Sequence, residues 1–98
     1  MAFVVEYTFV RPNTEVEWPA FGAEKDARLE ALREAHSISS HDIISDDELT
    51  WKRIQSAVST EEYTAFYKKG QPIWEEAKIT DTAADRSIQV DMVVTENT

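Results

Sequence analysis

The chain has 98 residues, with 10 basic and 19 acidic side chains, a formal net charge of −9 and a sequence pI near 4.6. This negative charge argues against nucleic acid and anionic membrane surfaces as ligands, because both are recognised by basic patches. The absence of cysteine excludes disulfides, thiolate catalysis and cysteine-ligated metal centres, so we expect one cytoplasmic domain over residues 1–98.

The first predicted element is a strand over residues 3–11. Large apolar side chains occupy every second position of it: Phe3, Val5, Tyr7 and Phe9. This period of two is typical of a strand with one apolar face. A connection with Pro19 and Gly22 follows, and we expect its Trp18 and Phe21 to lie against the core. Residues 23–36 are rich in Ala, Leu, Glu and Arg, which predicts the first helix.

A hairpin is predicted over residues 37–58. Residues 37–44 form a weak strand, residues 45–48 carry the Ser and Asp side chains of a turn, and residues 49–58 form the returning strand. The same region contains oxygen and nitrogen ligands that could hold a hard cation: His41, Asp42, Asp46, Asp47 and Glu48. The spacing and the glycine of an EF-hand are missing, so we favour a solvated turn and predict no metal.

The second helix begins after Ser59, whose spacing from Glu62 predicts a capping box. Aromatic residues then follow at helical spacing, and we expect Gly70 and Pro72 to bend or split the helix. The last strand is predicted from the alternation over residues 88–95, whose apolar positions are Ile88, Val90, Met92 and Val94.

The predicted order is strand, helix, strand, strand, helix, strand. Right-handed crossovers make this a ferredoxin-like α+β fold, with both helices on one face of a four-stranded antiparallel sheet. The other face is left bare. It is expected to carry Val4, Glu6, Thr8, Val10, Gln89, Asp91, Val93 and Thr95. This mixture suits a subunit interface, so we predict a homodimer through the open sheet face.

Five side chains form the candidate ligand site: Trp51, Arg53, Tyr63, Phe66 and Trp74. Aromatic rings and one guanidinium could line a pocket for a flat small molecule. The alternative is that these aromatics belong to the core or to the dimer interface. We expect Trp51 and Arg53 to share one face of their strand, and we predict no cofactor.

With this element order and the segment WKRIQSAVSTEEYTAFY over residues 51–67, the chain resembles the dimeric α/β-barrel superfamily. That superfamily includes antibiotic-biosynthesis-type monooxygenases and stress-responsive barrel proteins. The resemblance implies two ferredoxin-like subunits packed sheet against sheet. Many monooxygenase-like members carry a histidine near the position of Phe66, and haem-degrading relatives use an asparagine on the first strand. Neither residue is present here, so no catalytic residue is carried over.

Two functional hypotheses follow from different classes. The first is a small homodimeric protein that binds a small molecule or a protein partner. The alternative is a cofactor-independent monooxygenase-like enzyme on an aromatic or polyketide-like substrate, and that chemistry needs a base. The two histidines, His36 and His41, fall near a helix end and in the hairpin, which weakens this alternative. A subunit of a larger assembly is a third possibility that the acidic surface also fits.

Overall fold

A computed structural model describes the backbone of residues 2–97 and the side chains of residues 3–95. The elements in chain order are β1 (Ala2–Val10), α1 (Ala23–Ala35), β2 (Ser39–Ile44), β3 (Thr50–Ala57), α2 (Thr60–Ala77), α3 (Ile79–Asp85) and β4 (Gln89–Asn97). The predicted strands and helices form within a few residues of their expected positions. The short helix α3 is additional, because no element was predicted there. None of the helices in this described part of the chain is long and apolar enough to cross a membrane.

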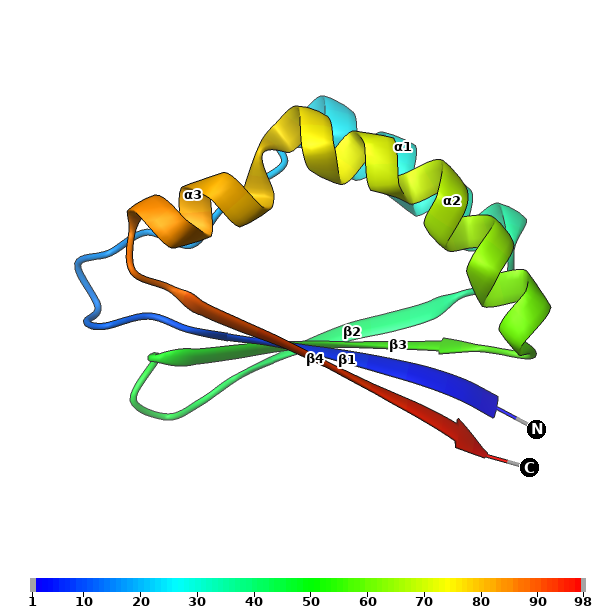
Figure 1. The fold of residues 1–98 in the computed structure, drawn as a ribbon, viewed down its shortest axis with the longest axis horizontal. Coiled ribbons are helices and arrows are strands. Elements are labelled where there is room, and N and C mark those ends of the chain that lie inside the picture. The colour runs from blue at the N-terminus through cyan, green and yellow to red at the C-terminus, as the bar shows by residue number, and fades with distance from the viewer. Residues whose placement is uncertain (1, 98) are drawn as a thin grey trace.

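The strands form one antiparallel sheet in the order β2-β3-β1-β4. All helices lie on one side of this sheet, where they form an arch above the strands (Figure 1). The arrangement confirms the predicted ferredoxin-like fold class. The two ends of the chain lie next to each other at one end of the sheet, since β1 and β4 are antiparallel neighbours (Figure 1).

The central strand β1 supplies the middle of the core. Val5 and Phe9 point toward the helices and are fully buried, while Phe3 and Tyr7 pack on the same side. The predicted apolar face of this strand is therefore confirmed. Around Val5, the core is completed by Ile38, Ala57, Tyr63 and Phe66, and around Phe9 by Ile79, Ala83 and Ile88.

The pairing with β1 decides which way the side chains of β3 point, because directly paired residues share a face. Phe9 pairs with Trp51, Tyr7 with Arg53 and Val5 with Gln55. Trp51 and Arg53 therefore share a face, as expected, and it is the face toward the helices.

Helix α2 covers the predicted range without interruption. Of the expected bend or split at Gly70 and Pro72, the split is wrong, because α2 continues through both residues to Ala77. The break lies at Lys78, which adopts a left-handed conformation with φ 54° and separates α2 from α3. Gly70 is buried against α1: a Cβ atom there would be 3.6 Å from the Leu29 side chain. A Cβ atom at this distance would make an ordinary van der Waals contact, so the packing of the two helices does not by itself require a glycine.

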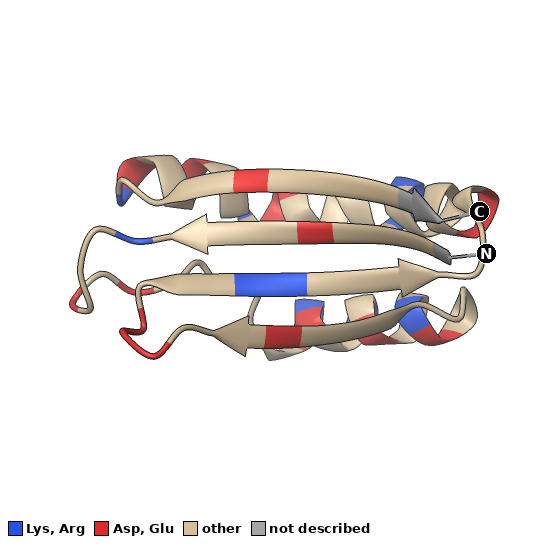
Figure 2. Cartoon of the chain, turned by 90° about the horizontal axis from the view of Figure 1, so that it is seen from below, with Lys and Arg blue, Asp and Glu red and all other residues tan. Residues whose placement is uncertain are grey.

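The face of the sheet opposite the helices is uncovered. Figure 2 looks onto this face and shows charged residues only in short stretches of its strands, with the helices behind. The β1 and β4 residues predicted to lie there do so, because Val4, Glu6, Thr8 and Val10 pair with Thr95, Val93, Asp91 and Gln89. One ion pair crosses the face, between Lys52 Nζ and Glu6 Oε1 at 3.3 Å.

Candidate functional site

A cavity of about 440 Å³ lies between the helices α2 and α3 and the strands β1, β3 and β4. This volume is in the usual range for small-molecule sites. Its wall is mostly aromatic and apolar, with Tyr7, Tyr63, Phe66, Trp74, Val90 and Met92 among the residues that line it.

Regular spacing in α2 builds one wall of this cavity. Tyr63, Phe66, Gly70 and Trp74 fall three to four residues apart, which places them on one side of a helix. Tyr7 enters from the floor, since it lies on the helix-facing side of β1, and its ring packs 5.4 Å from that of Trp74. The cavity therefore combines a helix stripe with a strand position more than 50 residues earlier in the sequence.

Three polar side chains form a chain of hydrogen bonds in the cavity wall. The Tyr63 hydroxyl donates to Gln55 Oε1 at 3.4 Å, and the hydroxyls of Tyr7 and Tyr63 are 3.3 Å apart. A phenol has one proton, so Tyr63 accepts from Tyr7. Gln55 is only 4% exposed, yet it lines the cavity, and none of the hydrogen bonds seen in residues 3–95 uses its amide nitrogen. This leaves an amide donor next to the cavity.

Both phenols are held in their neutral form. Burial raises the pKa of Tyr63 above its ordinary value near 10. Burial also raises the pKa of Tyr7. The inner wall of the cavity therefore presents uncharged donors and acceptors, and neither tyrosine can act as a base near neutral pH.

The charged residues that line the cavity are exposed to solvent. They are Glu75, Lys78, Asp81 and Asp91. The Asp91 side chain points to the open sheet face, so two carboxylates and one ammonium give this rim a negative balance.

The structure places the five predicted site residues in two groups. Tyr63, Phe66 and Trp74 line the cavity, whereas Trp51 and Arg53 do not. Arg53 instead forms a two-pronged ion pair with Asp42 on β2, with N–O distances of 3.0 and 3.2 Å.

Trp51 lies in an aromatic stack beneath the connection between β1 and α1. Its ring is 4.7 Å from that of Phe9 and 5.9 Å from that of Trp18, and the Arg53 guanidinium lies 5.2 Å from its centroid. Arg11 covers the Trp18 ring at 4.5 Å. Trp18 and Phe21 thus contact the core, as expected from the sequence.

Sequence reasoning missed Tyr7 and Gln55 as site residues. The sequence identified Tyr7 only as part of the apolar face of the first strand, and its position opposite α2 follows only from the fold. Gln55 lies in a strand whose pattern assigned neither face, so no local signal distinguishes it from a solvated glutamine.

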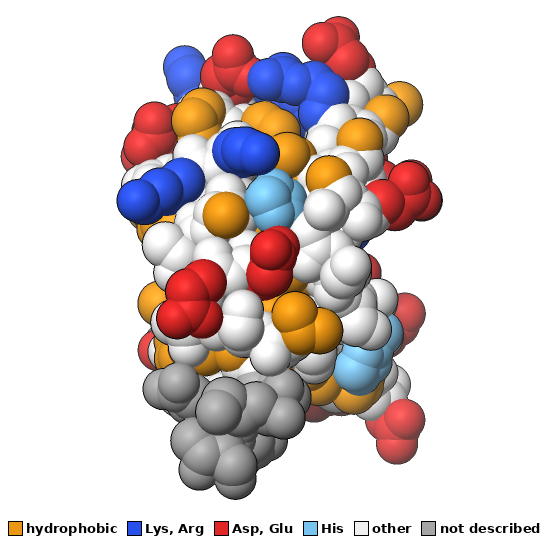
Figure 3. Space-filling model, turned by 90° about the vertical axis from the view of Figure 1, so that its right-hand side faces the viewer, with side chains coloured by type: hydrophobic (Ala, Val, Ile, Leu, Met, Phe, Trp, Pro, Cys, Tyr) orange, Lys and Arg blue, Asp and Glu red, His pale blue; other side chains and the backbone are white. Residues whose placement is uncertain are grey.

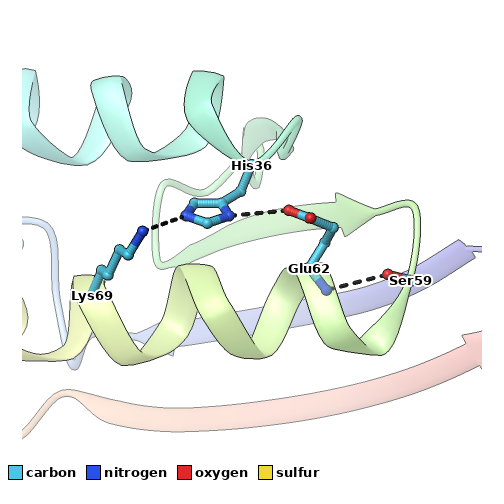
Figure 4. A network of polar contacts seen from close by, with 4 residues as sticks. All are labelled: His36, Ser59, Glu62 and Lys69. Atoms are coloured by element: carbon cyan, nitrogen blue, oxygen red, sulfur yellow. Dashed lines mark hydrogen bonds and ion pairs between the residues drawn. The ribbon is translucent and has the colours of Figure 1, made fainter.

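A second polar cluster lies outside the cavity, where the end of α1 meets the start of α2 (Figure 4). The His36 ring donates from Nδ1 to Glu62 Oε2 at 3.0 Å, and Lys69 Nζ lies 3.4 Å from Nε2. A neutral ring protonated at Nδ1 satisfies both contacts. Figure 3 shows this end of the molecule, where a histidine ring lies between acidic and basic side chains. The cluster joins the two helices at the surface.

The acidic turn between β2 and β3 is built from local hydrogen bonds, as the hairpin prediction requires. Asp47 accepts from the Ser45 hydroxyl at 2.6 Å and from the Leu49 backbone N–H at 3.0 Å. These bonds lower the pKa of the Asp47 carboxyl. Within the described residues there is no group of three or more His, Asp or Glu side chains placed to hold a metal ion.

Comparison with solved structures gives the same architecture. A de novo designed protein, Foldit4, is 11% identical over all of both chains with a TM-score of 0.53. The fold is ferredoxin-like. A dimeric ferredoxin-like protein from an uncultured marine organism is 14% identical, covering 99% of this chain and 90% of its own, with a TM-score of 0.49. Rv0793 from Mycobacterium tuberculosis is 13% identical over 100% of this chain and 98% of its own, with a TM-score of 0.46.

Comparison by sequence gives no match to a protein-family model or to a curated protein. The identities to the solved structures are low, so the likeness concerns the fold and assigns no chemistry.

Proposed function

We propose that this ferredoxin-like protein binds a small, flat and uncharged molecule in the cavity beneath α2. The observation that carries the proposal is Gln55, a buried side chain whose amide nitrogen is left for a ligand while its oxygen is held by Tyr63. A carbonyl oxygen on the ligand is the natural acceptor for this donor. The aromatic rings of Tyr7, Phe66 and Trp74 would contact the ligand's faces and edges.

The preference for an uncharged ligand follows from the cavity's electrostatics. Moving an ionic group from water to an apolar wall is unfavourable unless an opposite charge receives it. Tyr7 and Tyr63 remain neutral, and the charged lining residues are exposed at the rim. An anionic substituent would also meet the acidic balance of that rim.

The enzymatic alternative, a cofactor-independent monooxygenase-like activity, receives less support. A base inside the cavity is required to form a substrate carbanion. Neither His36 nor His41 lines the cavity, and the two inner tyrosines have raised pKa values. Binding without chemistry is therefore the function we favour.

The ligand proposal can be tested with coumarin, flavone and anthraquinone as neutral carbonyl probes and coumarin-3-carboxylate as the charged counterpart. We expect tryptophan fluorescence quenching and a rise in melting temperature with at least one neutral probe, and about tenfold weaker binding of the carboxylate. Gln55→Leu should weaken the carbonyl probe by about tenfold, because a ligand hydrogen bond of about 1 to 1.5 kcal/mol is lost.

Arg53→Ala is the control for this experiment, since Arg53 pairs with Asp42 outside the cavity. It should leave probe affinity within about twofold. No binding by any neutral probe at 1 mM, or equal binding by Gln55→Leu and the parent protein, would contradict the proposal.

We also propose that the protein forms a homodimer through its open sheet face. Four strands of six to nine residues, about 4.8 Å apart and about 3.3 Å per residue, give a face of roughly 500 Å², so two stacked faces bury about 1,000 Å², the lower end of the range for a specific interface. Glu6, Asp91 and Lys52 give this face a formal charge of −1, although the whole chain carries −9. Stacking two such faces therefore avoids most of the repulsion between two acidic chains.

A further inference from the structure

The strand β4 forms one edge of the sheet, and its apolar side chains remain exposed on both faces. Val90, Met92 and Val94 point to the helix side and are 43, 57 and 49% exposed, because the helices leave this flank uncovered. Val93 points to the open face and is 54% exposed. The stacked dimer proposed above covers Val93 but leaves the other three residues in solvent.

The two edges of the sheet differ in how well they are protected. Edge strands present unpaired N–H and C=O groups, and proteins usually block them with charges, prolines or a short strand. At the β2 edge, the strand has six residues, and its Asp42 carboxylate is held by Arg53. By contrast, β4 has nine residues and no proline, and its centre reads Val90, Asp91, Met92, Val93, Val94. Its backbone edge is open to another strand.

Charge decides what kind of strand fits this edge. The described side chains of β4 include Asp91 and no lysine or arginine. Pairing β4 with β4 of a second copy would therefore bring two Asp91 carboxylates onto adjacent strands without a cation. Glu75 and Asp81, on the rim of the neighbouring cavity, add to the negative potential, which Lys78 offsets only in part. A strand with basic side chains would complement this edge.

We propose that β4 accepts an extended, basic peptide segment of another protein as a fifth strand of the sheet. Main-chain hydrogen bonds to the free edge would supply affinity, as in other cases of strand addition. Alternate apolar side chains of the peptide would cover the flank of Val90, Met92 and Val94, while its basic side chains would lie on the side of Asp91. Val90 and Met92 also line the cavity, but the main-chain pairing uses the outer edge of the sheet, so the inference does not depend on the ligand of the cavity.

The probe is a fluorescein-labelled, capped seven-residue peptide in which lysine and valine alternate, measured by fluorescence anisotropy at 50 mM salt. We expect saturable binding to the whole protein. The same peptide N-methylated at every residue keeps its charge and side chains but cannot donate main-chain hydrogen bonds. It should bind at least tenfold more weakly.

Two substitutions with the same change in net charge test the position. Asp91→Lys should lower the affinity of the protein for the peptide by at least fivefold. Asp46 lies in the turn that follows β2, the opposite edge strand. Beyond the effect of net charge, which both substitutions share, Asp46→Lys should change the affinity of the protein for the peptide by less than twofold. Both residues are exposed, so folding is preserved.

Three outcomes would overturn the inference. Equal affinity for the peptide and its N-methylated analogue would show that only charge attraction acts. Equal weakening by Asp91→Lys and Asp46→Lys would place the peptide elsewhere. Loss of self-association on Met92→Lys, measured by light scattering without peptide, would assign the edge to a second copy.

Discussion

Tyr63 links the packing of α2 to the polar wall of the cavity. Its ring contacts Phe3 and Phe66 at centroid distances of 5.2 and 5.7 Å, so the aromatic part belongs to the core. Its hydroxyl is shared between Tyr7 and Gln55. A single side chain therefore contributes both apolar burial and the orientation of the Gln55 amide.

The raised pKa of Tyr63 predicts a loss of stability in alkali. An unfolded tyrosine ionises near pH 10, whereas the folded protein keeps Tyr63 protonated to higher pH. The contribution of the neutral Tyr63 phenol to the free energy of unfolding is complete below pH 10. It decreases as the pH rises above 10, because ionisation of tyrosine then favours the unfolded state. Urea unfolding from pH 7 to 11 should show a steeper alkaline loss for the parent protein than for Tyr63→Phe.

Tyr63→Phe should also cost about 1 kcal/mol at pH 7, since Gln55 loses its donor. Tyr7→Phe should reduce the alkaline loss in the same direction, because burial raises the pKa of that phenol too. An identical pH dependence for the parent protein and both variants would contradict the prediction.

Among the secondary-structure elements, α2 contributes the largest share of the cavity wall, and its start is defined by a side-chain cap. The Ser59 hydroxyl accepts a hydrogen bond from the Glu62 backbone N–H at 3.2 Å. The Glu62 carboxylate, which a reciprocal capping box would direct back to Ser59, is engaged by His36. The first turn of α2 is thus tied to the end of α1.

Ser59→Ala should destabilise the protein by about 1 kcal/mol, because the Glu62 N–H loses its acceptor. Ser59→Asp, which keeps an acceptor and adds a favourable charge at the helix N-terminus, should remain within about 0.5 kcal/mol of the parent protein. Urea unfolding followed by circular dichroism measures both. Equal stability of Ser59→Ala and the parent protein would show that the cap contributes nothing.

At the scale of the whole molecule, the uncovered sheet face determines the assembly we expect. The proposed dimer has a mass of about 22 kDa, twice the 11.2 kDa of the chain. Light scattering at micromolar concentration measures this mass directly, and a monomer would contradict the proposal.

Two neighbouring isoleucines of β2 provide a matched test of the face used. Ile43 lies on the open face and is 48% exposed, and Ile44 lies on the helix side and is 53% exposed. Ile43→Glu should weaken the dimer by at least tenfold, whereas Ile44→Glu should leave it intact. The same effect from both substitutions would exclude the open face as the interface.

The sequence alone determined the four strands, the helices α1 and α2 and their order, but not the short helix α3. The alternation in β1 and around residues 88–95 identified the strands and their helix-facing sides, because this period is a local property of the backbone. Ser59 likewise marked the start of α2 through a hydrogen bond that spans three residues. Gly70 and Pro72 do not split α2 as predicted, because the packing of α2 on its neighbours outweighs the low local helix propensity of these residues.

Only the tertiary structure decided the composition of the cavity. Arg53 and Gln55 are two residues apart on the same strand face, yet Asp42 holds Arg53 at the β2 side while Gln55 lines the cavity. Tyr7 reaches Tyr63 across 56 positions of sequence. These contacts depend on the register of strands that meet only in the folded chain, and no local pattern of residues encodes that register.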